Sequence, residues 1–204
     1  MIRIALVGSI GSGKSYIAKL FNFPVFNADQ EVNKIYKKDK KIFLKLKKKL
    51  PKFFLKFPVK KNEIINAILN NKKNLKLITA IIHPIIKKKL FRFIKINKNK
   101  KIIILDIPLY LENNLQKKKD VVIFVQGNLN EIKKRLVKRT NYNLKLINQF
   151  KKIQLPIEKK IKKSHFIIKN DFTMSTAKKY VKRILNNILN ERSSTRYRNN
   201  RSFS

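Results

Sequence analysis

Short apolar runs alternate along the chain with longer segments whose apolar residues follow helical spacing. The first run leads into a glycine-rich loop, and a helical segment at 15–21 separates it from the second run. Because buried parallel strands have nearly continuous apolar sequences, this order predicts a βαβ unit. The pattern as a whole predicts an α/β fold in which helices flank a parallel sheet of about five strands. The predicted strands are 2–7, 25–26, 102–105, 121–125 and 166–168.

The pattern changes between residues 30 and 97, where apolar residues recur only at helical offsets, as at 64–69 and 81–90. This stretch is far longer than an ordinary crossover between strands. We therefore expect an inserted helical subdomain that closes over a substrate. Within it, His83 precedes Pro84, and a residue before proline favours extended backbone, so we expect His83 at the start of a helix.

The net charge suggests a nucleic-acid partner, but the rest of the composition argues against one. A formal net charge of +40 normally indicates a nucleic-acid partner, because Lys and Arg neutralise phosphates. However, Lys, Ile and Asn make up 95 of the 204 residues, and the codons of all three are AT-rich. The lysines are also spread along the chain instead of forming one stripe. We attribute the charge to compositional bias and expect no specific nucleic-acid partner, although the charge would still attract anionic substrates.

The absence of certain features narrows the class of protein. The chain has no cysteine, so it forms neither a disulfide nor a thiolate metal site. Its first residues do not resemble a signal peptide, and no run of about 18 apolar residues occurs. We expect a cytoplasmic protein without a membrane partner, either a monomer or a weak homo-oligomer.

Residues 8–15 read GSIGSGKS and match the phosphate-loop pattern G-x-x-x-x-G-K-[ST] at every fixed position. The loop follows a predicted strand and opens a predicted helix, so its backbone N–H groups can face a phosphate chain. Lys14 can reach the β- and γ-phosphates of a nucleotide, and the Ser15 hydroxyl can bind Mg²⁺. Three of the four glycines lie in this loop, which argues against a chance turn. The expected nucleotide-binding residues here are Gly8, Gly11, Ser12, Gly13, Lys14, Ser15 and Tyr16.

A phosphate loop alone leaves kinases, GTPases, motors and helicases open. The chain has no N-K-x-D guanine-binding motif, and 204 residues leave little room for motor machinery. The sequence therefore favours a small-molecule kinase that uses ATP and Mg²⁺.

Acidic residues are scarce, with 11 in the chain, and two near the ends of predicted strands stand out. Asp29 would lie at the carboxyl edge of the sheet, beside the phosphate loop, where a carboxylate can accept a proton from an attacking hydroxyl. The alternative is that Asp29 caps the next helix. Asp106 ends a predicted strand, as a Walker B carboxylate does, and could hold Mg²⁺ through water. Its alternative is an Asp that begins a loop before Pro108.

Two arginines, Arg135 and Arg139, lie four residues apart on one predicted helix face, just before the polar stretch 140–143. A planar guanidinium suits phosphate oxygens, so an Arg at the start of a lid can stabilise charge during transfer. The alternative is a solvated basic face. His83 is isolated from the other histidine, so no metal site with histidine ligand spacing is indicated.

In their order and spacing, these segments resemble the dephospho-coenzyme A kinase family from Met1 to about Glu191. The phosphate loop is common to many proteins, so the other segments are the specific part. The resemblance implies a P-loop NTPase fold and transfer of phosphate from ATP to the ribose 3′-hydroxyl of dephospho-coenzyme A, the last step of coenzyme A synthesis. The similar segments are IALVGSIGSGKS, FNAD, IIHPII, DIPLYLE, KRLVKR, KIQLPIEKK and SHFIIKN.

The resemblance also implies roles by position. Asp29 would be the base acting on the 3′-hydroxyl, and Lys14 and Arg139 would stabilise the transferred phosphoryl group. Asn170 would lie near the adenine of ATP, and the helical insert would bind the acceptor. The residues implied on the acceptor side are His83, Leu109 and Glu112.

The same resemblance divides the chain into parts. We expect one P-loop kinase domain over residues 1–192, followed by a disordered basic tail at 193–204 that lacks any apolar period. The expected parts of the domain are the core at 1–29, 98–139 and 164–192, the acceptor-binding insert at 30–97 and the lid at 140–163.

The chain departs from the family pattern at several positions. Asn33 stands where Arg or His is usual, and the neighbouring Lys34 is the cation that can compensate. The other departures are Asn27 for the first Asp of D-A-D, Tyr16 for Thr after the phosphate loop and Thr140 for Asp after the lid arginine.

Two other functions stay open on the sequence alone. The first is another P-loop kinase, acting on a nucleoside, nucleotide or small metabolite chosen by the helical insert. The second is an RNA-binding NTPase, which predicts salt-sensitive RNA binding and RNA-stimulated ATP hydrolysis. The aromatic residues are mostly Phe within apolar helical patterns and suggest no base-stacking platform, which counts against the second function.

Overall fold

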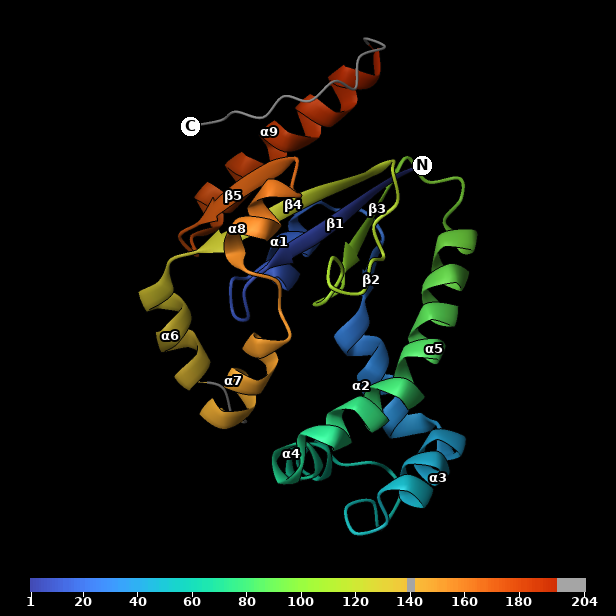
Figure 1. Ribbon diagram of the computed structural model, residues 1–204. Helices are drawn as coiled ribbons and strands as arrows, with labels where there is room; N and C mark the ends of the chain where they lie inside the picture. The colour runs from blue at the N-terminus through green and yellow to red at the C-terminus, as the bar shows by residue number, and fades with distance from the viewer. Residues whose placement is uncertain (139–141, 194–204) are drawn as a thin grey trace. The chain divides into compact units, whose positions relative to one another are not determined.

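The computed structural model describes residues 1–138 and 142–193 and divides them into two compact units (Figure 1). The sheet unit comprises the described residues of 1–26, 99–142 and 153–204. The helical unit comprises 27–98 and 143–152. The expected core, insert and lid boundaries stay predictions. The described residues of the expected lid are shared between the units, since 143–152 belongs to the helical unit and 153–163 to the sheet unit.

A five-stranded parallel sheet, flanked by helices, forms the centre of the sheet unit. The strand order is β2-β3-β1-β4-β5, and the central strand β1 pairs in parallel with both β3 and β4. The predicted fold class is confirmed. The strands are β1 (Ile2–Gly8), β2 (Val25–Asn27), β3 (Ile102–Asp106), β4 (Asp120–Gly127) and β5 (Phe166–Asn170).

Burial on both faces explains why the strands have continuous apolar sequences. Ile103 and Ile104 point to opposite faces of β3, and both are fully buried. One face packs against Ile17 of α1 and Val181 of α9. Each such buried side chain contributes about 1.5–3 kcal/mol to the free energy of unfolding. The helices of this unit are α1 (Lys14–Leu20), α6 (Leu129–Val137), α8 (Ile157–Lys162) and α9 (Met174–Ser193).

The helical unit has its own apolar core, with Leu46 and Phe54 fully buried at 0% exposure. Leu146 and Phe150 of α7 pack against this core although they lie far along the chain from the other helices. This long-range packing explains why 143–152 belongs to the unit. The helices are α2 (Ala28–Lys38), α3 (Lys40–Lys49), α4 (Lys61–Asn70), α5 (Lys72–Ile96) and α7 (Leu144–Lys152).

The expectation that His83 starts a helix is wrong, because α5 continues through His83 and Pro84 as one helix of 25 residues. Proline has no N–H and therefore removes one hydrogen bond from the helix interior. Buried Ile82 and Leu90 flank Pro84 and anchor α5 on both sides of that loss. Tertiary packing thus overrides the local preference that the sequence indicates.

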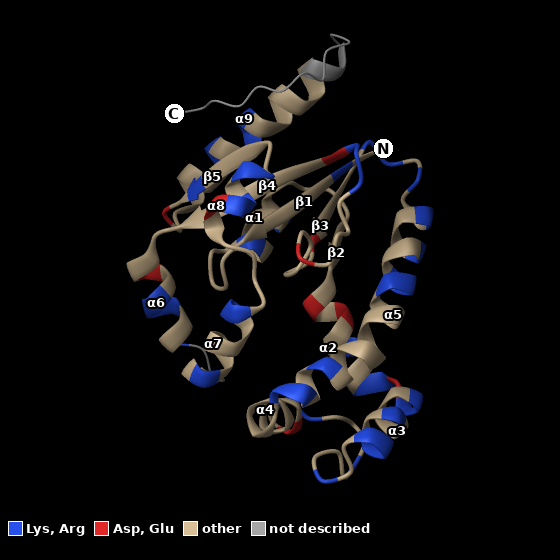
Figure 2. Ribbon diagram, in the orientation of Figure 1, with Lys and Arg blue, Asp and Glu red and all other residues tan. Residues whose placement is uncertain are grey.

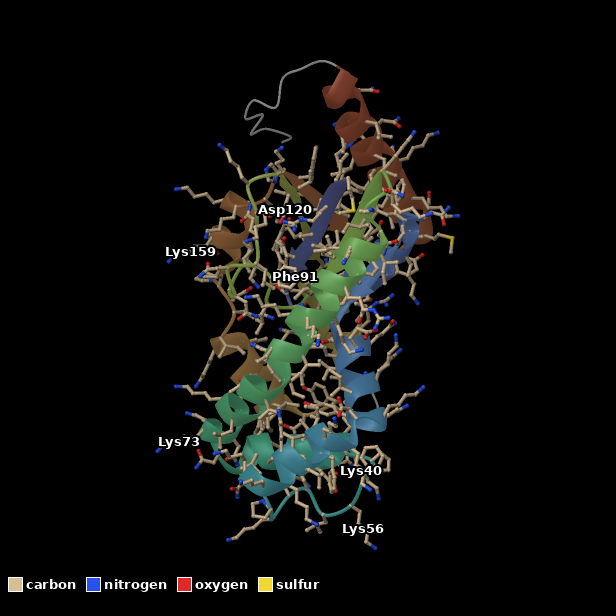
Figure 3. All side chains as sticks on the ribbon, turned by 90° about the vertical axis from the view of Figure 1, so that its right-hand side faces the viewer. Lys40, Lys56, Lys73, Phe91, Asp120 and Lys159 are labelled. Atoms are coloured by element: carbon tan, nitrogen blue, oxygen red, sulfur yellow. The ribbon has the colours of Figure 1, made fainter. Side chains whose placement is uncertain are left out.

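Lys and Arg are distributed over the helices of both units (Figure 2). Lys40, Lys56 and Lys73 of the helical unit extend outward from the ribbon (Figure 3). This distribution is what compositional bias produces at tolerant surface positions. Within the described residues, no helix combines the length and apolarity needed to cross a membrane.

Candidate active site

The phosphate loop joins β1 to α1, and its shape depends on glycine. Gly8 and Gly13 have φ angles of 150° and 93°, which other residues rarely adopt. A Cβ on Gly8 would collide with the carbonyl oxygen of Val125, and a Cβ on Gly13 would collide with the Asn170 carboxamide. Both the dihedral angles and the close neighbours therefore exclude larger residues.

Lys14 folds back over this loop. Its Nζ donates hydrogen bonds to the carbonyl oxygens of Gly8 at 3.1 Å and Ser9 at 2.7 Å. The ammonium is therefore held beside the loop, where a phosphate oxygen is a stronger acceptor than a neutral carbonyl. Ser15 and Tyr16 are both exposed on the first turn of α1.

Ser12 tests whether the loop suits a polar ligand. Its hydroxyl is fully buried and has no hydrogen-bond partner among the described residues. Buried polar atoms are normally satisfied by protein, water or ligand. A loop with an unsatisfied hydroxyl and a nearby ammonium fits a nucleotide phosphate chain.

Asn170 ends β5 and braces the phosphate loop. Its Nδ2 donates to the Ser12 carbonyl at 2.9 Å, and its Oδ1 accepts from the Phe172 N–H at 3.0 Å. The Phe172 ring lies 4.2 Å from the guanidinium carbon of Arg135, a cation–π distance. Asn170 thus links the loop to the segment after β5, and Arg135 contacts an aromatic ring instead of forming only a solvated face.

The predicted Mg²⁺ ligands are Ser15 and Asp106, both oxygen donors of the type that Mg²⁺ prefers. Asp106 is the buried last residue of β3 and pairs in register with Leu6 of β1, which leads into the phosphate loop. No cluster of three or more His, Cys, Asp or Glu suitable for a metal occurs among the described residues. Mg²⁺ needs no such cluster, because it usually keeps several waters and binds substrate phosphates.

Glu112, predicted on the acceptor side, points into the sheet unit. Its Oε1 lies 3.0 Å from Lys160 Nζ and accepts a hydrogen bond from the Leu155 N–H, also at 3.0 Å. Leu109 is partly exposed in the same segment after β3. The two residues therefore have different surroundings although both were assigned to one site.

Asp29 lies in the first turn of α2, in the helical unit. The N-cap is Asn27, whose side chain accepts a hydrogen bond from the Gln30 N–H at 2.8 Å. Asn27 therefore performs the capping that was the alternative role for Asp29. A carboxylate in the first turn is favoured by the helix dipole.

Further charged groups of the helical unit lie near Asp29 in sequence or on α5. Lys34, the cation next to Asn33, pairs with Glu31 at 2.6 Å. That hydrogen bond, with a second from Lys89, holds the pKa of Glu31 below its usual range. His83 lies on the exposed side of α5, and partial burial lowers the pKa of its imidazole.

Arg139 and Thr140 lie outside the described residues, so the catalytic role of Arg139 stays a prediction.

One buried network was missed by the sequence reasoning. Asp120, 2% exposed at the start of β4, pairs with Arg3 and accepts hydrogen bonds from the Tyr110 hydroxyl and the Lys117 N–H. Burial, together with the bond to Asp120, raises the pKa of Tyr110. The available signal was a scarce carboxylate directly before an apolar run. Lys160 was also missed, and it gave no signal among 42 lysines.

Comparisons with known proteins agree with the arrangement of these motifs. The family model described as dephospho-CoA kinase matches residues 2–176. A dephospho-CoA kinase of Bartonella quintana is 32% identical over 191 residues, covering 91% of this chain and 97% of that protein. One from the Wolbachia of Brugia malayi is 32% identical over 183 residues, covering 87% and 91%.

Two solved structures resemble the chain in fold. TT1252 from Thermus thermophilus has a TM-score of 0.72 at 23% identity, covering 93% of this chain and 97% of that one. The dephospho-CoA kinase from Campylobacter jejuni has a TM-score of 0.64 at 24% identity, covering 93% and 98%. The match of the family model over most of the sequence, together with a relative that is 32% identical over 91% of the chain, leads to one conclusion: this chain belongs to the dephospho-CoA kinase family.

Proposed function

We propose that this protein transfers the γ-phosphoryl group of ATP to the ribose 3′-hydroxyl of dephospho-coenzyme A, giving coenzyme A and ADP in the cytoplasm. The observation that carries the proposal is the family match over residues 2–176, which includes the phosphate loop and the segments implied on the acceptor side. The phosphate loop alone supports only the nucleotide half of the reaction.

The sheet unit would bind the donor. The N–H groups of the loop and the Lys14 ammonium would hold the β- and γ-phosphates, whose oxygens would replace the carbonyl partners that Lys14 has now. Ser15 and Asp106 would hold Mg²⁺, directly and through water. At that place Mg²⁺ would supply neutralisation of the phosphate charge. Asn170 would keep the loop in shape through its bond to Ser12.

The proposed base is Asp29, in the first turn of α2. Asp29 would take the proton of the 3′-hydroxyl as that oxygen attacks phosphorus. The proton transfer prevents positive charge from building up on the attacking oxygen. The Asn27 cap fixes the turn that carries Asp29. His83 would bind the acceptor through a hydrogen bond from its imidazole. Arg139 would stabilise the transferred phosphoryl group.

An acceptor screen tests the proposal. The purified protein is incubated with ATP, Mg²⁺ and either dephospho-coenzyme A, nucleosides, nucleoside monophosphates or RNA, and ADP formation is followed. We expect ADP to form stoichiometrically with coenzyme A. Phosphorylation of nucleoside monophosphates with dephospho-coenzyme A unchanged would favour another small-molecule kinase. ATP hydrolysis that depends only on RNA would favour an NTPase.

A further inference from the structure

Lys160 on α8 is buried, in a chain whose lysines otherwise lie at the surface. It is 2% exposed, and no other Lys or Arg among the described residues is classed as buried. Compositional bias explains lysine at tolerant surface positions. It does not explain a buried lysine, because an unpaired ammonium in the interior costs several kcal/mol. The position of Lys160 therefore indicates a specific requirement.

The partners of Lys160 come from two separate segments. Its Nζ lies 3.0 Å from Glu112 Oε1 and donates to Gln154 Oε1 at 3.2 Å. The same Glu112 oxygen accepts the Leu155 N–H at 3.0 Å. The Glu112 side chain is only 9% exposed, so both members of the pair are largely removed from water. Together these contacts tie the segment after β3 to residues 154–155.

Both tied segments have a place in the proposed reaction. Residues 154 and 155 follow the point at which the chain returns to the sheet unit from α7 of the helical unit. On the other side, Glu112 follows the partly exposed Leu109, which is implied on the acceptor side. Between them, the hydroxyl of buried Tyr110 donates to Asp120. Leu109 thus directly precedes two buried anchors, Tyr110 on Asp120 and Glu112 on Lys160.

We propose that Lys160 is a positioning residue for acceptor binding, an inference that rests on the proposed function. By holding Glu112 and Gln154, Lys160 fixes the segment that carries Leu109 against residues 154–155. Glu112 then acts inside the protein as the partner of Lys160, and not as a direct ligand of the acceptor. Nucleotide binding at the phosphate loop does not depend on this pair.

The test compares Lys160→Met with Lys159→Met, because Lys159 is the preceding residue of α8 and is exposed (Figure 3). The readouts are kcat, KM for dephospho-coenzyme A, and Kd for ATP without acceptor. We expect Lys160→Met to raise the acceptor KM about 10- to 100-fold, the loss typical of misplaced binding groups. The Kd for ATP should not change, and Lys159→Met should match the wild type. Lys160→Arg should recover part of the affinity, because a guanidinium can also bridge Glu112 and Gln154.

Loss of Lys160 leaves a buried carboxylate unpaired, so Lys160→Met can fail to fold. The double variant Lys160→Met/Glu112→Gln removes both charges and should recover the melting temperature of the wild type while the acceptor KM stays raised. The inference is overturned if a folded variant without Lys160 keeps the wild-type acceptor KM. It is also overturned if Kd for ATP rises in parallel with KM, as a general loss of structure would produce. A wild-type protein that leaves dephospho-coenzyme A unphosphorylated would instead overturn the proposed function, and this inference with it.

Discussion

All four glycines lie in the sheet unit and none in the helical unit, although both units are rich in lysine and isoleucine. In the sheet unit the dihedral angles and close neighbours at Gly8 and Gly13 exclude any other residue. In the helical unit most polar positions are exposed and tolerate whatever the composition supplies. The composition of this chain is strongly biased toward Lys, Ile and Asn. A residue of another type therefore indicates a position where structure or function requires it.

The same comparison applies to charge. Lysines on the surface of both units are what a lysine-rich composition produces. Lys160 is of the same abundant type, but it is buried, which the composition does not explain. Asp29, the proposed base, is unusual for its residue type, because the chain has only 11 carboxylate side chains. In the sheet unit, residues of a scarce type therefore indicate the functional positions. In the helical unit, few positions have such a residue.

The largest effect is expected at Asp29. Asp29→Asn keeps the shape of the side chain and removes the proton acceptor, so kcat should fall about 10²–10⁴-fold. ATP binding by the sheet unit should be unchanged, as measured by calorimetry without acceptor. Asp39→Asn is the matched control, because Asn can still cap α3 as Asp39 does. Near-normal turnover of Asp29→Asn would remove Asp29 as the base.

Lys14→Ala should act on the other unit. Loss of the ammonium beside the phosphates should lower kcat about 10²–10³-fold and weaken ATP binding as well. Lys19→Ala, at an exposed position of the same helix, should behave as the wild type in both assays. If Lys14→Ala bound and used ATP normally, the assignment of residues 8–15 to the donor would be wrong.

Asn170→Ala should have an intermediate effect. It removes the bond to the Ser12 carbonyl and the acceptor for the Phe172 N–H, so unfolding should cost about 1–3 kcal/mol less. ATP binding should weaken because the loop loses its brace. Thermal unfolding and ATP titration measure the two effects, with exposed Asn186→Ala as the control. Unchanged ATP affinity would mean that the loop holds its shape without Asn170.

The smallest effect is expected for surface charge on α3. Replacing Lys45, Lys48 and Lys49 by Gln should change the free energy of unfolding by at most about 0.5 kcal/mol per site, because all three are exposed. Turnover at physiological salt should stay near that of the wild type, since surface charge acts at long range only when salt is low. A large loss of acceptor affinity at that salt would show that these lysines do more than follow composition.

The sheet could be predicted from the sequence, because its strands are buried on both faces and their apolar runs are continuous. The phosphate loop could be predicted because its geometry demands glycine and lysine at fixed spacing.

Three features could not be predicted from the sequence. Pro84 lies inside α5 because packing outweighs a local backbone preference. Leu146 and Phe150 join a core built mostly by residues 35–86, and only tertiary packing reveals this. Lys160 is marked by burial alone.

The candidate site divides in the same way. Lys14, Ser15 and Asp106 were predicted from motifs that are read along the chain. Glu112 was also predicted, but its pairing with Lys160 joins residues 48 positions apart, which no local pattern encodes. Asn27, which accepts the Gln30 N–H, is the N-cap of α2, and Asp29 as the base stays a prediction.

The position of the transferred phosphate tests the central claim most directly. The product of the reaction with ATP, Mg²⁺ and dephospho-coenzyme A is separated by chromatography and compared with authentic coenzyme A and its 2′-phosphate isomer. The account predicts a single product that co-elutes with coenzyme A, with one ADP formed for each molecule. A phosphate on another hydroxyl, or ADP formation without any modified dephospho-coenzyme A, would contradict it.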